Sequence, residues 1–210
     1  MRSTVLGLML GLGSALVSCG PPPLPLHANV AYTETCRSVP AEMRPGCPGS
    51  AWVFVGGLRE GNPPLDVSCT VSPDMTRVRF RVARGTGLSF AENPGIFVVG
   101  TVAGNVPNAS LRDGCADVHF QGAQSDGNPI PGAVSSNGRG CDVRINALSI
   151  DSSGTRANIS GRIRCVDLPD TSVPARYHQV GTSDPMTDPE YGSFEFISCT
   201  VGQIAQMCTG

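Results

Sequence analysis

The chain has 210 residues, of which 40% are hydrophobic, 15% are charged and only 5% are aromatic. All fifteen basic residues are arginine, and the lack of lysine excludes a P-loop, a Schiff-base lysine and a Ser-x-x-Lys nucleophile pair. The formal net charge of −2 gives no general reason to expect nucleic acid as a partner.

The first eighteen residues have the pattern of a secretion signal. Met1 and Arg2 give a positive start, residues 4–17 are almost wholly apolar, and small residues precede Cys19. As a helix, the apolar run would reach only about 21 Å, which is too short to cross a bilayer. We therefore expect a cleaved signal over residues 1–18.

Leu16, Val17, Ser18 and Cys19 resemble the bacterial lipobox. That resemblance implies a diacylglycerol on the sulfur of Cys19, cleavage before it and acylation of the new amino terminus. Several acyl chains anchor a protein stably where one would be marginal. The alternative is an ordinary secreted protein with Cys19 as an odd thiol. We expect a lipoprotein of the bacterial cell envelope, anchored to a membrane with its domain on the extracytoplasmic side.

Eight further cysteines indicate an oxidising compartment. They are Cys36, Cys47, Cys69, Cys115, Cys141, Cys165, Cys199 and Cys208. This even set without a Cys-x-x-Cys pair favours four disulfides over a zinc or thioredoxin-like site. Residues 20–27 contain four prolines and predict an extended stalk of about 25 Å. We expect a disulfide-closed loop between Cys36 and Cys47, so that residues 19–50 form the stalk and loop and residues 51–210 form one domain.

From residue 51 the pattern is that of β-strands. Short runs rich in Val, Ile, Phe and Thr are bounded by turn residues, and no stretch has a sustained helical period. We predict strands over residues 51–55, 67–71, 77–83, 96–102, 116–122, 142–150, 156–166 and 194–201. The expected fold class is all-β, an antiparallel sandwich or small barrel of about eight strands, stapled by disulfides. Residues 96–99 are apolar on both faces, which predicts a central strand.

Residues 152–154 predict a three-residue hairpin loop with Gly154 in the left-handed conformation. Such a turn places opposite each other residues whose numbers sum to about 306, as those of Cys141 and Cys165 do. Both cysteines share the apolar phase of their strands, so we expect a cross-strand disulfide that faces the core. The apolar phase then slips, which we attribute to a bulge near Asn146.

Three groups of residues between Leu65 and Val201 carry a family resemblance: Val67-Ser68-Cys69-Thr70, Ile159-Ser160-Gly161 with Val166-Asp167-Leu168, and Phe194-Glu195-Phe196-Ile197-Ser198-Cys199. Their layout resembles that of the small mycobacterial lipoprotein antigens. The resemblance implies a β-sandwich with a disulfide from an early strand to the last, Cys69 to Cys199. Cys115 and Cys208 are then paired by elimination. The family brings no agreed enzymatic chemistry.

Three arginines form the candidate ligand face. Arg77, Arg79 and Arg81 share one face of a strand, about 6.6 Å apart, a spacing suited to phosphates or acidic glycans. The alternative is a solvated face neutralised by acids on neighbouring strands. Arg162 and Arg164 would extend the patch if their strand were adjacent.

Metal and catalytic candidates have less support. Asp117 and His119 share a strand face, and with His178 they form a candidate divalent-metal set, although a polar outer face is the simpler explanation. Residues 183–190 contain three acids but lack the EF-hand pattern. No Gly-x-Ser-x-Gly or His-Glu-x-x-His motif occurs. We assign no catalytic residue and no cofactor.

The expected function is a non-catalytic binding or structural role at the cell envelope. The membrane is the first partner, through the lipid anchor, and an envelope protein or an anionic glycan or lipid is the second. One alternative is an exported hydrolase with a metal or paired-carboxylate site. Another is an accessory subunit of an envelope complex, which should expose an apolar patch of several hundred Å².

Overall fold

The computed structural model shows an all-β protein. It describes residues 24–38, 50–61, 63–85, 95–104, 106–120, 123–124, 128–130, 140–169, 176–181 and 191–205. Within these ranges no helix is long and apolar enough to cross a membrane. The described strands form one continuous hydrogen-bonded sheet.

The strands of this sheet are, in chain order, β1 (His27–Ser38), β2 (Ser50–Gly57), β3 (Leu65–Val71), β4 (Arg77–Arg84), β5 (Gly95–Ala103), β6 (Ala109–Phe120), β7 (Ala123–Gln124), β8 (Asn128–Ile130), β9 (Gly140–Ile150), β10 (Arg156–Pro169), β11 (Arg176–Gly181) and β12 (Gly192–Val201).

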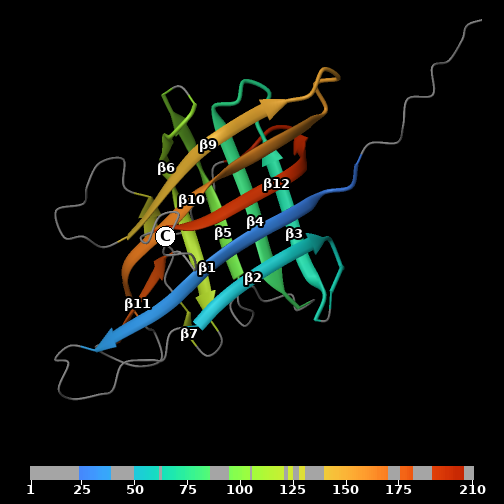
Figure 1. Cartoon of the computed structure of the whole chain (residues 1–210). Helices are drawn as coiled ribbons and strands as arrows, with labels where there is room; N and C mark the ends of the chain where they lie inside the picture. The colour runs from blue at the N-terminus through green and yellow to red at the C-terminus, as the bar shows by residue number, and fades with distance from the viewer. Residues whose placement is uncertain are drawn as a thin grey trace, which may run out of the picture.

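The sheet folds over into two facing layers (Figure 1). The back layer contains β3, β4, β5 and β6 in that order, each antiparallel to the next. The front layer contains β2, β1, β10 and β9, with β12 and β11 end to end between β1 and β10. Hydrogen bonds pass between the layers where β9 meets β6 and where β12 runs parallel to β3. The expected antiparallel, disulfide-stapled all-β fold is confirmed.

The core lies between the layers and is filled by alternate residues of nearly every long strand. At its centre, the ring of Phe80 from the back layer lies 4.6 Å from that of Phe194 and 5.0 Å from that of Phe196, measured between centroids. All three side chains are buried. Burial of aromatic and aliphatic surface of this kind is the main force that holds two layers together.

All eight predicted strands are present, but β1, β11 and the short strands β7 and β8 were not predicted. Residues 19–50 were assigned to a stalk and a loop, whereas residues 27–38 form β1 inside the sheet, with Cys36 opposite His178 of β11. Ala28, Val30 and Tyr32 alternate toward the core, so the period-2 signal was present in the sequence. The extended stalk can therefore include at most the residues before His27.

The hairpin between β9 and β10 matches the prediction with one change of length. Gly154 is left-handed, with φ 72°, and the Asp151 N–H donates to the Arg156 carbonyl at 2.8 Å, which leaves four residues in the loop instead of three. Asn146 is the extra residue of a bulge opposite Ser160 and Gly161. The bulge restores the predicted register farther from the turn.

Two of the four predicted disulfides lie in the described part of the chain, and both are confirmed. Cys141 and Cys165 are direct register partners on β9 and β10, with Cα atoms 4.0 Å apart. Cys69 and Cys199 join β3 to β12, with Cα atoms 4.7 Å apart. The Cys36–Cys47 and Cys115–Cys208 pairs remain predictions, because Cys47 and Cys208 lie outside the described residues.

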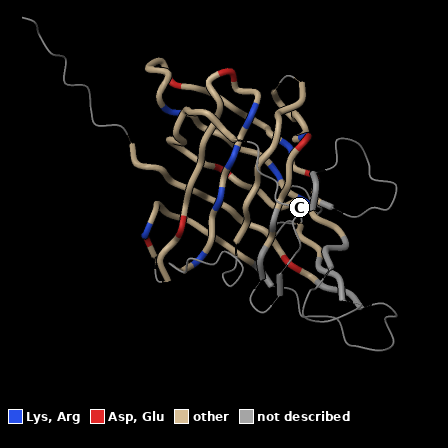
Figure 2. The backbone as a smooth tube through the Cα atoms, turned by 180° about the vertical axis from the view of Figure 1, so that it is seen from behind, with Lys and Arg blue, Asp and Glu red and all other residues tan. Residues whose placement is uncertain are grey.

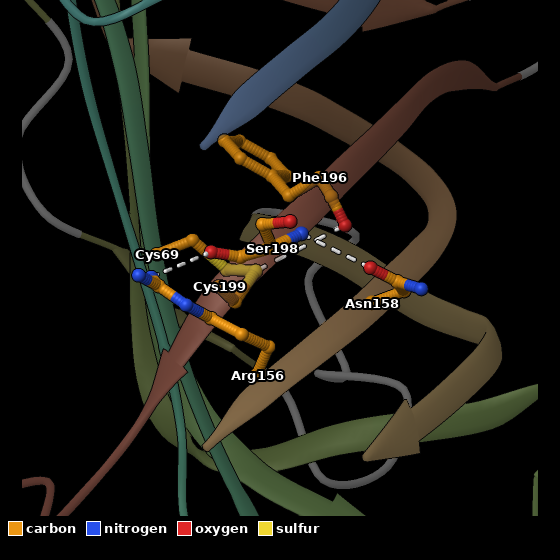
Figure 3. Close-up of a disulfide and its surroundings, with 6 residues drawn as sticks. All are labelled: Cys69, Arg156, Asn158, Phe196, Ser198 and Cys199. Carbon is orange, nitrogen blue, oxygen red and sulfur yellow. Dashed lines mark hydrogen bonds between the residues drawn. A yellow bond between two sulfur atoms is a disulfide. The ribbon is translucent and has the colours of Figure 1, made fainter. Parts of the chain in front are cut away.

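A bulge in β12 turns Cys199 toward its partner (Figure 3). Ser198 is left-handed, with φ 63°. Its N–H donates to Oδ1 of Asn158 at 3.0 Å, and its carbonyl accepts from the Arg156 guanidinium at 3.4 Å. The bulge changes the alternation of β12, so Cys199 faces the core although it is an odd number of residues after the inward-facing phenylalanines. This bulge positions the Cys199 sulfur for the bond to Cys69.

Candidate functional site

The arginine stripe lies on the outer face of the back layer. Arg77, Arg79 and Arg81 point away from the core while Val78, Phe80 and Val82 between them are buried. Figure 2 shows the basic residues as a row along β4 in the middle of this layer. The strand has this alternation because apolar and basic residues follow each other with the period of a pleated sheet. The three charges therefore share one surface, as predicted.

Arg81 is held by an acid on the neighbouring strand. Its guanidinium lies 2.9 Å from the carboxylate of Asp66 on β3, and both side chains are about a third exposed or less. This is the neutralised arrangement that the sequence analysis gave as the alternative for the whole stripe. It applies to Arg81, so an external anion at this position has to compete with Asp66.

Arg79 and Arg77 are more exposed than Arg81. The Arg79 guanidinium stacks over the Phe97 ring of β5, 5.4 Å from its centroid, which leaves its charge at the surface. The Arg77 guanidinium donates to the carbonyl of Ile204 at 3.4 Å, a long bond to a neutral acceptor. These two cations form the part of the stripe best suited to an external anion.

An open cavity of about 420 Å³ adjoins Arg77 at the turn between β3 and β4. It is lined by Ser72, Pro73, Asp74, Thr76, Arg77, Gln203 and Ile204. The Asp74 carboxylate accepts from the Ser72 hydroxyl at 2.5 Å and from the Thr76 N–H at 3.1 Å. These bonds lower the pKa of Asp74 to about 2, so the cavity keeps a negative charge at neutral pH. Because the Asp74 carboxylate repels anions, an anion should bind more favourably along β4 than inside this cavity.

The chain after β12 crosses onto this same outer face. Gly202 donates its N–H to the Val71 carbonyl at 2.9 Å, and Ile204 is buried against Val99 and Cys115, with Phe97 partly buried beside them. This small apolar cluster lies outside the main core. It places Cys115 on the arginine face beside Ile204. Ile204 precedes Cys208 by four residues, which span at most about 14 Å when extended.

The condition under which Arg162 and Arg164 would extend the patch, adjacency of their strand to β4, is not met. Their strand, β10, belongs to the front layer and pairs with β9, β11 and β12, not with β4. Arg164 instead lines a separate cavity of about 280 Å³ with Thr33, Thr35, Cys165, Val166, Gln179, Val180 and Gly181. The sequence showed that these arginines lie on a polar face, but it did not show which layer the strand joins.

The predicted metal candidates are only partly placed. Asp117 and His119 lie on β6, opposite Phe97 and Gly95, and His178 lies on β11 in the other layer. The side chains of all three, and the whole of residues 183–190, are outside the described part. Among the side chains that the structure does describe, no group of three or more His, Cys, Asp or Glu could hold a metal ion. The candidate metal set therefore stays untested.

Sequence reasoning missed a buried polar group between β1 and β2. Glu34 is 9% exposed and accepts a hydrogen bond from the Trp52 indole N–H at 3.1 Å. The nearby Tyr32 hydroxyl is buried, and burial, with Glu34 as the second cause, raises the pKa of Tyr32 above its usual value. Tyr32 also stacks on Phe54, with ring centroids 5.9 Å apart. This group therefore belongs to the packing of the front layer.

Phe97 and Ile204 were also missed as parts of the candidate site. The sequence placed Phe97 in a central strand, which is correct for β5 between β4 and β6, but gave no sign that Arg79 covers it.

A comparison with protein-family models, with curated protein sequences and with solved structures finds no significant match.

Proposed function

We propose that this chain is an exported, lipid-anchored protein of the bacterial cell envelope that binds an anionic partner without catalysis. The lipobox ending in Cys19 supports the anchor. The observation that carries the binding role is the pair of exposed guanidiniums of Arg77 and Arg79 on one outer face. The partner is a polymer or headgroup with repeated negative charges, because two cations about 6.6 Å apart match repeating anions better than a single one.

The arrangement of Arg79 supports binding over a purely structural role. A guanidinium that stacks on an aromatic ring keeps its N–H donors in its own plane and directed outward. There they are able to bind an oxyanion. The Arg77 guanidinium donates to the Ile204 carbonyl, and a phosphate or sulfate oxygen is a stronger acceptor for a guanidinium than a carbonyl. Arg81 is paired with Asp66 and is therefore less available to the anionic partner than Arg77 and Arg79.

The binding test replaces the two exposed charges. The double variant Arg77→Gln and Arg79→Gln should bind immobilised heparin, used as the polyanion probe, about 2-fold to 30-fold more weakly, because exposed ion pairs contribute roughly 0.2–1 kcal/mol each. The weakening should be largest at low salt, where screening is least. The matched control is Arg144→Gln with Arg162→Gln, which removes the same charge from the front layer.

Equal loss in both double variants would show that only net charge matters and would reject the site. The Arg77 and Arg79 variant should also melt near the wild-type temperature, because exposed charges contribute little to folding.

The anchor has its own test. Replacement of Cys19 by Ser should release the protein from membranes or leave it unprocessed, because serine has no sulfur to carry the diacylglycerol. The measurement is membrane fractionation with a salt wash. A processed Cys19→Ser protein that still sediments with membranes would reject the lipid anchor.

A further inference from the structure

In Figure 1, β1 begins and β2 ends at the same corner of the front layer. Exposed apolar side chains gather at this corner. In the described part of the chain, six large apolar side chains are exposed, and four of them belong to this corner. They are Leu24 at 68%, Val53 at 47%, Val55 at 56% and Leu58 at 54% exposure. The other two lie in turns of the back layer. The apolar surface is thus concentrated at one place.

The pairing of β1 with β2 brings these residues together. His27 is opposite Gly57 in the register, so the chain leading into β1 and the turn leaving β2 are neighbours. Val53 and Val55 alternate with the inward residues of β2 and therefore share its outer face, and Leu58 follows Gly57 directly. We name Leu24, Val53, Val55 and Leu58 the apolar corner.

An ordered turn holds Leu58 at the surface. The Gly57 N–H donates to the carboxylate of Glu60 at 2.7 Å, and the Glu60 N–H donates back to the Gly57 carbonyl at 3.2 Å. Arg59 adopts a left-handed φ of 66°, and its N–H donates to the Leu65 carbonyl at 2.7 Å. Leu58 and Arg59 are both exposed, so an apolar and a cationic side chain project next to each other. This pair suits the boundary between acyl chains and headgroups.

We infer that the apolar corner rests on the lipid bilayer that holds the anchor, an inference that depends on the proposed lipidation of Cys19. Five residue steps separate Cys19 from Leu24, which at full extension span at most about 18 Å. Because β1 begins at His27, the tether includes no more of the chain than the stalk predicted over residues 20–27. The end of the domain nearest the membrane is therefore the apolar corner.

The test uses the full, lipidated chain in phosphatidylcholine vesicles with or without brominated acyl chains. Leu58→Trp adds an indole at the corner, and Val106→Trp is the matched control, since Val106 is exposed at 38% in the turn between β5 and β6. The emission of each variant is compared with that of the parent, which contains one tryptophan. The expected result is loss of the added emission in brominated vesicles for Leu58→Trp and none for Val106→Trp.

Vesicle flotation of the parent separates the two hypotheses. If the parent does not float with vesicles, the anchor is absent and both the proposed function and this inference fail. If the parent floats but the brominated lipid quenches neither variant, the anchor stands and the bilayer contact is rejected. Shielding of the Leu58→Trp indole from iodide without quenching by brominated lipid would also reject the contact, because another protein surface would then cover the corner.

Discussion

Removal of the Cys69–Cys199 disulfide should destabilise the protein more than removal of Cys141–Cys165. The first bond joins residues 130 apart in the sequence and the second joins residues 24 apart. In the chain-entropy model, a cross-link restricts the unfolded chain more when it closes a longer loop, and these separations correspond to about 5 and about 3.5 kcal/mol of the free energy of unfolding.

The order of the two losses does not depend on which bond is removed first. Cys141 and Cys165 lie inside the loop that Cys69 and Cys199 close, so their bond shortens that loop to roughly 110 residues and changes its contribution by only about 0.2 kcal/mol. All four cysteines are buried, so the cavities left by alanine have similar costs and largely cancel in the comparison. The difference of about 1.5 kcal/mol therefore reflects loop length.

The assay is urea and thermal unfolding of two double variants, Cys69→Ala with Cys199→Ala and Cys141→Ala with Cys165→Ala. For a chain of this size the first pair should lower Tm by about 10–20 °C, since 1 kcal/mol corresponds to about 2–4 °C. The second pair should lower it by about 7–14 °C on the same scale. If the Cys141 and Cys165 variant loses as much free energy as the other, or more, loop closure does not govern these disulfides.

Three further predictions follow from local geometry. Gly161→Ala should lower the free energy of unfolding by about 3 kcal/mol because of overpacking, since a Cβ would meet the Arg144 carbonyl and the Phe194 ring. Its control, Gly202→Ala, adds a Cβ with only an ordinary contact at 3.8 Å and should be near neutral in the same denaturation assay. Ser198→Val should lose about 1–2 kcal/mol because of its left-handed φ, whereas Ser198→Gly should not, and equal melting of the two would contradict the strained bulge. The Asp74 carboxyl should titrate at a pKa of about 2 and not at 3.8 by NMR. Its contribution to the free energy of unfolding is therefore present above about pH 4 and is lost as the pH falls toward 2, and Asp74→Asn should remove that part of the pH dependence.

Short-range features of this fold were readable from the sequence. The alternation of arginines with Val78, Phe80 and Val82 fixed which face of β4 is buried, because side chains alternate strictly across a strand. Gly154 marked the β9–β10 turn, and the position of this turn set the register that pairs Cys141 with Cys165. The lipobox and the even number of later cysteines predicted an anchor and disulfides without any reference to the fold.

The neighbours of each strand were decided only by the tertiary structure. The alternation in β1 did not reveal that it lies between β2 and the end-to-end pair of β12 and β11, nor did the pattern of β10 reveal that its arginines belong to the front layer. Phe97 under Arg79 and Ile204 over Cys115 are contacts between segments far apart in the chain. Periodicity records which side of a strand meets the core, but pairing between distant strands depends on how all of the buried surfaces fit together at once. That fit is a property of the whole folded chain, so no single stretch of sequence contains it.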